Sequence, residues 1–345
     1  MPEDSIAHID FDELNRKAIS RPLVAHIYTA DPSAHVFNGK IYIYPSHDIN
    51  AGDAFDDLGS HFAMEDYHVL SMNHPLDKNA IDHGVALHVT DVPWAEKQMW
   101  APDAAEKDGK YYLFFPSKDY DGIFRIGVAI SDSPTGPFTA QREAIKGSFS
   151  IDPAVFKDDD GSYYMYFGGI WGGQLQRWKK GSFMAEQPES PLAFLPNDNE
   201  PALCAKVVKL SDDLLSFTDV PKDVVIVGED DQPLLQGDNE RRFFEASWMH
   251  KYNGKYYFSY STGDTHFICY AIGDNPYGPF TYKGVVLNPV VGWTNHHSIV
   301  EFEGKWYLFY HDSSLSKGVT HLRCVKVTEL KHNADGTIET ITPYK

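Results

Sequence analysis

Three acidic residues occupy equivalent places in a repeated sequence pattern, and their types suit acid–base chemistry. Asp31 and Asp152 each begin an Asp-Pro pair, whereas Glu245 follows the apolar pair Phe243-Phe244. Crowded and poorly solvated carboxyl groups differ in pKa, and cleavage of a glycosidic bond uses one protonated acid together with one ionised carboxylate. The apolar neighbours of Glu245 favour its protonated form. We therefore expect Glu245 to act as an acid in a site shared with Asp31 and Asp152.

The repeated pattern predicts five similar pairs of β-strands. Each copy has an apolar run, a glycine-centred turn and an aromatic strand, and Asn-Gly or Asp-Gly between alternating runs is a strong hairpin signal. A second pattern follows two copies, at 128–138 and 270–280, and reads as a third strand, a Pro-Gly turn and an outer strand. Two hairpins make a four-stranded sheet, and five such sheets arranged radially make a propeller. The copies begin at Asp31, Ala101, Asp152, Glu245 and His296, and their turn glycines are Gly39, Gly109, Gly161, Gly254 and Gly304.

We therefore predict an all-β protein whose single domain, residues 22–345, is a five-bladed β-propeller. Residues 1–21 form an N-terminal extension, in which a short helix is expected because Asp10 and Glu13 have the spacing of a capping box. Uneven spacing of the copies places insertions in the first and third blades. The third-blade insertion, over 181–237, is rich in Pro, Asp and Asn and is expected to form surface loops.

A propeller brings the starts of its innermost strands together around the axis, although they are far apart in the sequence. An acidic residue at a single strand start would usually do no more than cap the strand. Here three of the five starts are acidic, and a fourth is His296. This coincidence favours a functional site at the axis.

Composition and charge disfavour several classes of partner. The 345 residues carry a formal net charge of −19, which disfavours nucleic acid and anionic membranes because both reward basic surfaces. No stretch approaches the roughly 20 apolar residues that span a membrane. The sequence starts with an acidic segment without an apolar run, and its three widely spaced cysteines make no disulfide framework. A reducing, cytoplasmic location is therefore expected.

In their order and phase, the motifs resemble those of glycoside hydrolase family 43 over about residues 22–330. The resemblance implies an inverting five-bladed propeller enzyme that acts on xylan and arabinan fragments. It implies Asp31 as general base, Asp152 as the residue that positions and tunes the acid, and Glu245 as general acid. It also implies Trp100 as a wall of the sugar pocket and Arg323 as a donor to sugar hydroxyls. The motifs are Ala30-Asp31-Pro32-Ser33, Met99-Trp100-Ala101-Pro102, Ser150-Ile151-Asp152-Pro153-Ala154, Phe244-Glu245-Ala246, His296-His297-Ser298 and Arg323.

Two further residues are candidates for binding. His296 matches a family position near the axis that often ligates calcium or a water cluster. Calcium or another divalent cation is thus the expected cofactor, with waters completing its shell because calcium prefers oxygen ligands; a purely structural histidine is the alternative. Trp171, in a glycine-rich segment, is placed as a second pocket wall, with loop or core packing as the alternative. His311 and Asp312 end a strand and are expected to be structural.

Three functions compete on this sequence. The first is an exo-acting β-xylosidase with α-L-arabinofuranosidase activity on small oligosaccharides, and the second is an arabinofuranosidase or an endo-arabinanase with an open groove. The third is a non-catalytic sugar-binding propeller, which the acidic triad disfavours. The insertions favour exo action because they could close the groove into a pocket. The motifs around Asp31 and Asp152 differ from those of related fructan-cleaving propellers. No segment for the C-terminal β-sandwich of many family β-xylosidases follows the repeats, which leaves the preference for xylose or arabinose open.

Overall fold

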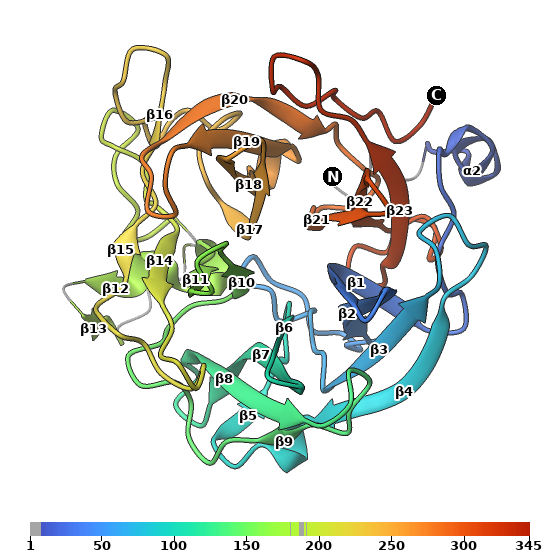
Figure 1. Cartoon of the computed structure of the whole chain (residues 1–345), viewed down its shortest axis with the longest axis horizontal. Coiled ribbons are helices and arrows are strands. Elements are labelled where there is room, and N and C mark those ends of the chain that lie inside the picture. Colours follow the sequence, from blue (N-terminus) through green and yellow to red (C-terminus); the bar gives the residue numbers. More distant parts are fainter. Residues whose placement is uncertain (1–7, 180, 186–189, 191) are drawn as a thin grey trace.

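Five β-sheets stand radially around a central axis as the blades of a propeller (Figure 1). The computed structural model describes residues 8–179, 181–185, 190 and 192–345, so the first seven residues of the expected N-terminal extension lie outside the described part. Nearly all regular structure in this part is β, and the predicted five-bladed architecture is confirmed. The repeated hairpin pattern was therefore a sufficient guide to the fold class.

In each blade the strands of the repeated pattern start with the innermost one and run outward through the sheet. In the described residues, the first four blades have the four antiparallel strands expected from two hairpins. Blade 1 contains β1 (Tyr28–Phe37), β2 (Lys40–Asp48), β3 (Asp66–Met72) and β4 (Ile81–His88); blade 2 contains β6 (Asp103–Lys107), β7 (Lys110–Asp119), β8 (Phe124–Ser131) and β9 (Thr139–Ala140), with β5 (Ala95–Lys97) also paired to β7; blade 3 contains β10 (Ala154–Lys157), β11 (Tyr163–Phe167), β14 (Lys206–Lys209) and β15 (Lys222–Asp223); blade 4 contains β17 (Glu245–Tyr252), β18 (Lys255–Ser261), β19 (Ile268–Gly273) and β20 (Phe280–Leu287), with β16 (Ile226–Val227) parallel to β20; and blade 5 contains β21 (His297–Phe302), β22 (Lys305–Asp312) and β23 (Cys324–Leu330).

The inner hairpins use the turns that the sequence predicts. Asn38 and Gly39, between β1 and β2, have φ angles of 52° and 74°, and Asn253 and Gly254, between β17 and β18, have φ angles of 48° and 75°. Two successive positive φ angles are a property of the type I′ turn, whose twist matches that of the flanking strands. Asn and Gly tolerate this conformation better than most residues, so the dipeptide itself directs the chain reversal.

Blade 5 is closed by residues 23–29, which lead into β1 and include its start, and this feature corrects the expectation of four consecutive strands in every blade. Leu23 N–H donates a hydrogen bond to Val325 O, and Thr29 N–H donates to Arg323 O, each at 2.9 Å. The outer side of β23 is thus paired with the chain that leads into blade 1. The ring is held shut by segments from opposite ends of the sequence.

The helix expected before the propeller is present as α2 (Phe11–Lys17). The carboxylate of its N-cap, Asp10, accepts hydrogen bonds from the N–H groups of Asp12 and Glu13. An N-cap of this kind satisfies backbone donors that have no partner within the helix. The short 3₁₀ segments are η1 (Val89–Asp91), η2 (Trp171–Gly173), η3 (Leu175–Arg177) and η4 (Gly263–Thr265).

Both predicted insertions lie at the end of the propeller where the inner strands begin. The blade 1 insertion, 49–65, follows β2, whose last residue pairs with the start of β1. The blade 3 insertion starts at Gly168, earlier than expected, and contains η2, η3 and the hairpin of β12 (Trp178–Lys179) and β13 (Ser182–Phe183). Part of the range 181–237 is not loop, because β14, β15 and β16 fall within it.

Aromatic side chains fill the spaces between neighbouring blades. Phe114, Tyr166 and Tyr260 are fully buried, and packing of this kind explains much of the 14% aromatic content.

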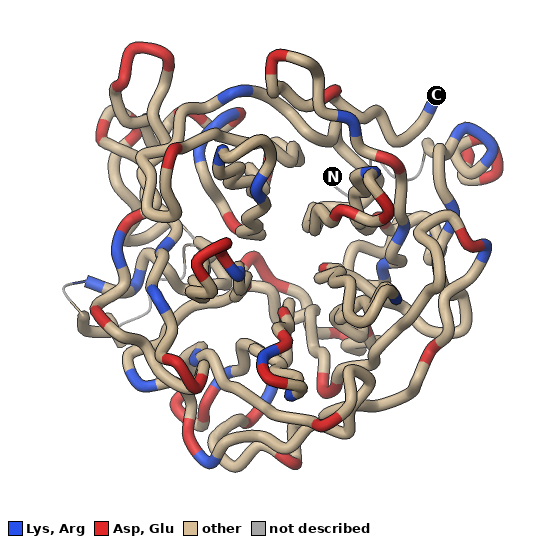
Figure 2. Tube along the Cα trace, viewed as in Figure 1, with Lys and Arg blue, Asp and Glu red and all other residues tan. Residues whose placement is uncertain are grey.

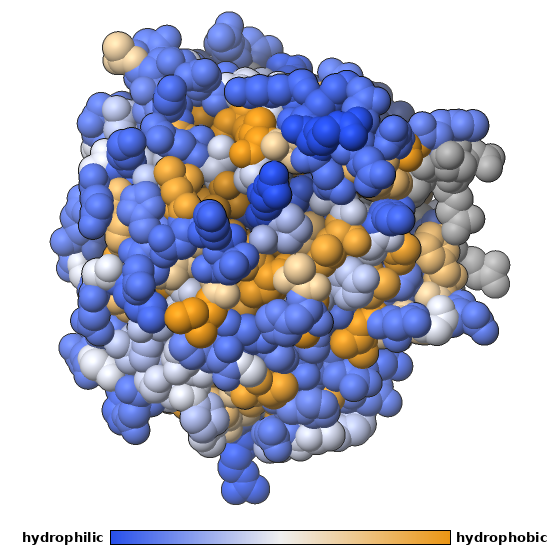
Figure 3. All heavy atoms as spheres, turned by 90° about the vertical axis from the view of Figure 1, so that its right-hand side faces the viewer, coloured by the Kyte–Doolittle hydropathy of each residue, from blue (hydrophilic) through white to orange (hydrophobic). Residues whose placement is uncertain are grey.

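Cys269 and Cys324 are buried free thiols, as expected. Charged residues of both signs are spread around the ring (Figure 2), and the side that carries β4 and α2 is largely hydrophilic with apolar residues in between (Figure 3). Among the described residues, no helix combines the length and apolarity needed to cross a bilayer.

Candidate active site

The starts of the inner strands converge at one end of the axis. Asp31 lies in β1, Asp152 precedes β10, Glu245 is the first residue of β17, and His296 immediately precedes β21. Asp31 and Asp152 have φ angles of 48° and 57°, and strand register shifts next to Asp31 and Glu245. Bulges re-aim side chains, and left-handed backbone at non-glycine residues clusters at functional sites. The strand starts are therefore shaped to direct these side chains.

Asp31 is held as an ionised carboxylate. Arg323 Nη1 donates to its Oδ1 at 3.0 Å, and Ser46 Oγ donates to its Oδ2 at 2.6 Å. Burial alone would raise the pKa of Asp31, but the charge of Arg323, the charges that His311 and His296 carry at acidic pH and the hydrogen bond from Ser46 outweigh burial and lower this pKa to about 2. A buried carboxylate that stays ionised can take a proton from water. Asp31 therefore has the properties of a general base.

Glu245 has the opposite character. Burial, and then the charge of Asp31, raise the pKa of Glu245 to about 8, so its carboxyl is protonated at neutral pH. Gly169 leaves the space for this side chain, because a Cβ atom there would lie 3.2 Å from Glu245 Cβ. Two carboxyl groups whose surroundings push their pKa values apart have the properties of an acid–base pair. This separation agrees with the roles implied for Asp31 and Glu245.

Asp152 ties blade 3 to the strand start that carries the acid. Its Oδ2 accepts a hydrogen bond from the N–H of Ala246 at 2.8 Å, and Ala246 directly follows Glu245. Burial, and then the charges of Glu245 and Asp31, raise the pKa of Asp152 well above its usual range. Asp152 thus contacts the acid through its backbone and shares its electrostatic environment.

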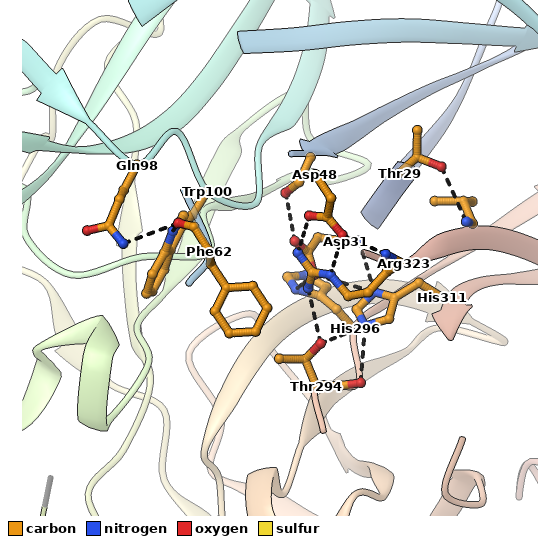
Figure 4. Close-up of polar contacts among 12 residues, drawn as sticks. Thr29, Asp31, Asp48, Phe62, Gln98, Trp100, Thr294, His296, His311 and Arg323 are labelled. Carbon is orange, nitrogen blue, oxygen red and sulfur yellow. Dashed lines mark hydrogen bonds and ion pairs between the residues drawn. The ribbon is translucent and has the colours of Figure 1, made fainter. Parts of the chain in front are cut away.

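Arg323 connects the ionised carboxylate to a second acidic residue (Figure 4). Its Nη2 and Nε donate to the two oxygens of Asp48 at 2.7 and 2.8 Å. Its Nη1 also donates to Thr294 Oγ1 at 3.1 Å, in addition to Asp31. Asp48 and Ser46 were missed in the sequence, although both lie near the end of β2, the strand that pairs with β1. That pairing was the available signal, because residues at the end of β2 must lie beside Asp31.

His311 reaches the site through the backbone. The N–H of Asp31 donates to His311 Nδ1 at 3.0 Å, and His311 Nε2 lies 3.1 Å from Thr294 O. Because Nδ1 accepts, the ring proton is on Nε2, and burial lowers the pKa of His311 to about 4, so the ring is neutral. His311 therefore holds the left-handed backbone of Asp31, which is a positioning role close to the structural one expected.

Trp100 lies beside this cluster, behind a second aromatic ring (Figure 4). Its Nε1 donates to Phe62 O at 2.8 Å, and its ring packs 4.6 Å from that of Phe124. The Phe62 ring centroid lies 4.9 Å from the Cζ atom of Arg323, so Phe62 separates Trp100 from the guanidinium. Phe62 belongs to the blade 1 insertion and has no motif to signal it. The Trp100 ring therefore lies behind that of Phe62, and its role as a pocket wall stays a prediction.

Loops from three blades meet around the site and form a rim. Trp171, in the blade 3 insertion, lies next to Phe244 with ring centroids 5.2 Å apart, and Phe244 directly precedes Glu245. The blade 3 insertion also contacts the loop before β21 and the blade 1 insertion. The blade 1 insertion in turn contacts the loop before β23. The contacting pairs are Trp171 with Trp293 (5.6 Å between ring centroids), Gly172 with the backbone oxygen of Leu58, and His61 with His321 (5.6 Å between ring centroids).

His296 faces two of the carboxylates from the axis. Its Nδ1 lies 3.5 Å from Asp31 Oδ1 and 3.9 Å from Asp152 Oδ2, which is longer than an ordinary hydrogen bond. Burial lowers the pKa of His296 to about 4, with Asp31 opposing and Arg323 assisting, so the imidazole is neutral at neutral pH. A neutral imidazole can bind a metal ion.

A propeller whose axis brings together an ionised carboxylate and a protonated carboxyl from different blades has the fold and the site of a glycoside hydrolase. The model of the glycosyl hydrolases family 43 matches residues 21–188 and 199–338, and the chain belongs to this family.

Relatives and solved structures are similar over nearly the whole chain. The sequence is 59% identical to a xylosidase/arabinosidase of Bacteroides ovatus, over 94% of this chain and 98% of that protein. It is 56% identical to a β-xylosidase of Xylanibacter ruminicola, over 91% and 97% of the two chains. A β-xylosidase/α-arabinofuranosidase from a compost microbial metagenome, solved with xylotriose in a calcium-free form, is 68% identical with a TM-score of 0.92, over 96% of this chain and 99% of that chain.

Proposed function

We propose that this protein is an exo-acting β-xylosidase that also has α-L-arabinofuranosidase activity, with short xylo-oligosaccharides as substrates. The observation that carries the proposal is the rim of loops from blades 1, 3 and 5 around a buried acid–base pair, since a rimmed pocket admits a chain end better than a chain interior. The relatives named for both activities support this substrate class. The two sugars present similar ring substituents, so one pocket can accept both.

In the proposed mechanism, Glu245 protonates the glycosidic oxygen as the bond to the anomeric carbon breaks. Asp31 takes a proton from the water that attacks this carbon from the opposite face, and the anomeric configuration inverts. Arg323 keeps Asp31 ionised, and Asp152 holds the backbone next to the acid. Trp171 and the rings of Phe62 and Trp100 are proposed as walls that orient the sugar.

Two measurements test this function. Xylotriose labelled at its reducing end should lose xylose from its non-reducing end, and among aryl xyloside, arabinofuranoside, galactoside and fructoside only the first two should be cleaved rapidly. NMR of the first-formed sugar from a β-xyloside should show α-xylose. Early release of internal fragments from linear arabinan would favour the endo-arabinanase, and initial β-xylose would exclude inversion.

We also propose that a divalent cation, with calcium preferred, binds at the axis with His296 as its protein ligand. His296 suits a metal ion because its imidazole is neutral and buried. Its Nδ1 lies beyond ordinary hydrogen-bond distance from both facing carboxylates, at 3.5 and 3.9 Å. The nearby oxygens of Asp31 and Asp152 already accept hydrogen bonds, so waters would complete the shell, which suits a hard cation. When bound, the ion would add positive charge near Asp31 and help to keep it ionised.

Removal of the metal tests this second proposal. The protein is treated with excess EDTA, freed of chelator and assayed before and after addition of calcium, magnesium or manganese. Activity should fall on chelation and return with the preferred ion, and His296→Gln should be insensitive to both treatments. Full activity of a sample shown to be metal-free by elemental analysis would leave His296 with a structural role.

A further inference from the structure

We propose that blade 1 carries a binding site for a zinc-type divalent metal ion, formed by His47, Asp66 and His68 and distinct from the axial His296. His47 lies in β2, and Asp66 and His68 lie in the neighbouring strand β3 (Figure 1). The nitrogen or oxygen that each residue offers lies within 4.8 Å of those of the other two. Two imidazoles and one carboxylate are a zinc-binding set that leaves a fourth position for water.

The three side chains are already close to the geometry that a tetrahedral ion requires. His47 Nδ1 lies 2.6 Å from Asp66 Oδ1, and the ring centroids of His47 and His68 are 4.4 Å apart. Asp66 and His68 are two residues apart on β3, and their ligand atoms lie within 4.8 Å of each other although the pairing of β3 with β4 is irregular at His68. Zinc bonds of about 2.0–2.2 Å place tetrahedral ligand atoms roughly 3.4 Å apart. Small side-chain rotations would therefore close the site without movement of the strands.

A second layer of contacts holds one ligand in a metal-binding orientation. His68 Nδ1 lies 2.8 Å from Asp82 Oδ1 on β4. The other ring nitrogen, Nε2, is therefore the one that would bind the metal ion. Asp82 is fixed in turn, since Oδ1 accepts from the N–H of Gly84 at 2.8 Å and Oδ2 lies 2.8 Å from His26 Nε2. Metal-binding histidines usually contact a carboxylate through the other ring nitrogen. Asp82 gives His68 this partner.

Charge and access also suit a cation. The side chains of His47, Asp66 and His68 are 17%, 15% and 11% exposed, so an ion could enter from solvent. The carboxylates of Asp66 and Asp82 lie within hydrogen-bond distance of His47 and His68, respectively. These carboxylates create a negative environment that would also attract a metal ion. The competing account is a network of hydrogen bonds among the histidines and carboxylates that binds no metal.

The test is a titration of the chelator-treated full-length protein with zinc chloride by calorimetry, in a His296→Gln background that removes the axial imidazole. One zinc ion per chain is expected. His68→Gln should weaken binding at least ~100-fold, and Asp82→Asn should weaken it about 10–100-fold because it only orients the ligand. His83→Gln, on the same strand β4 but outside the cluster, is the matched control and should leave the affinity unchanged.

Cobalt substitution provides a readout that does not depend on activity. The Co²⁺-loaded protein should show the visible absorption of a tetrahedral site, and His68→Gln should lose it. Asp66→Asn, which keeps the side-chain shape, serves the same purpose if His68→Gln does not fold. Failure of the His296→Gln protein to bind zinc, or equal zinc affinity in the folded cluster variants, would overturn the proposal and leave the hydrogen-bond network.

Discussion

At the scale of single residues, one guanidinium accounts for much of the difference between the two central carboxyl groups. Arg323 donates directly to Asp31, whereas for Glu245 its charge is a weaker influence than burial and the charge of Asp31. The same ionised carboxylate that is stabilised by Arg323 therefore helps to keep Glu245 protonated. The acid and the base depend on each other, and neither would have its pKa in isolation.

Substitution of the three carboxyl groups should separate their roles. Asp31→Asn, Asp152→Asn and Glu245→Gln should each lower kcat on xylobiose by at least ~10²–10⁴-fold, the usual contribution of general acid–base assistance. Glu245→Gln should lose much less on an aryl xyloside with an acidic leaving group, because that leaving group needs no proton, whereas Asp31→Asn should lose equally on both. Circular dichroism checks the fold. Near-wild-type rates in any variant would remove that residue from the mechanism.

The pH dependence of kcat/KM should have its basic limb at about 8. Glu245 must be protonated to donate, and its pKa is raised to about 8, so the rate should be constant below this pH and fall about tenfold per unit above it. Asp31, with a pKa of about 2, should cause no loss between pH 5 and 8. Glu245→Gln should abolish the basic limb for an activated substrate. A basic limb near pH 5 would contradict the assignment of Glu245 as the acid.

At the scale of strands and turns, glycines and bulges make the space for the acid. Gly169 follows β11 and faces the start of β17, where a Cβ atom would lie 2.6 Å from Ile151 Cδ1 and 3.2 Å from Glu245 Cβ. Ile151 precedes Asp152, so this one glycine adjoins the strand starts of two blades. The separation between blades 3 and 4 at the site depends on the absence of a side chain there.

Gly169→Ala should therefore damage activity beyond its effect on stability. Overpacking typically costs about 1–3 kcal/mol, and a displacement of about 1 Å at a reacting group can cost ~10²-fold in rate. Gly127→Ala is the matched control, because its Cβ would lie 2.4 Å from Trp94 Cζ2 and 2.9 Å from Phe115 Cζ, away from Glu245. Both variants should melt earlier, but only Gly169→Ala should lose kcat. Equal kcat in the two would show that Glu245 tolerates the shift.

Features that depend on short stretches of sequence were predictable, and features that depend on neighbouring blades were not. Asn38-Gly39 directs its turn locally, so the hairpins and the phase of Asp31, Asp152 and Glu245 could be read from the sequence. Asp48 could not be assigned in this way, because its partner Arg323 is 275 residues away. The segment that closes blade 5, residues 23–29, was missed because it does not contain the repeated pattern.

At the scale of the whole molecule, the two ends of the chain close the ring together. Besides the pairing of residues 23–29 with β23, Ile19 N–H donates to Pro343 O at 3.0 Å. Tyr344 Oη donates to the buried Asp312 Oδ2 at 2.7 Å and accepts from the N–H of Val291 at 3.1 Å. Asp312 also pairs with Lys326 at 2.7 Å. The C-terminal segment thus satisfies polar groups inside blade 5.

Tyr344→Phe should lower the melting temperature and leave catalysis intact. The change removes one of the donors to Asp312, which keeps Lys326, and leaves the Val291 N–H without its acceptor; an unsatisfied buried group costs about 1–3 kcal/mol. Tyr120→Phe, at a residue that is 70% exposed, is the control and should melt as the wild type does. Calorimetry measures both variants, and kcat at 25 °C should match the wild type. An unchanged melting temperature for Tyr344→Phe would show that the C-terminal contacts add little.

The contact between Asp31 and Arg323 joins residues 292 positions apart. During synthesis on a ribosome, blades 1 to 4 would emerge while Arg323 was still untranslated or inside the exit tunnel, so Asp31 would lack both its cation and its neighbours from blade 5. A nascent or prematurely terminated chain would carry all three carboxyl groups and yet lack the guanidinium and the imidazole that hold Asp31 in place. Activity in this architecture thus requires that translation has continued into the last blade. Truncated fragments should not hydrolyse glycosides.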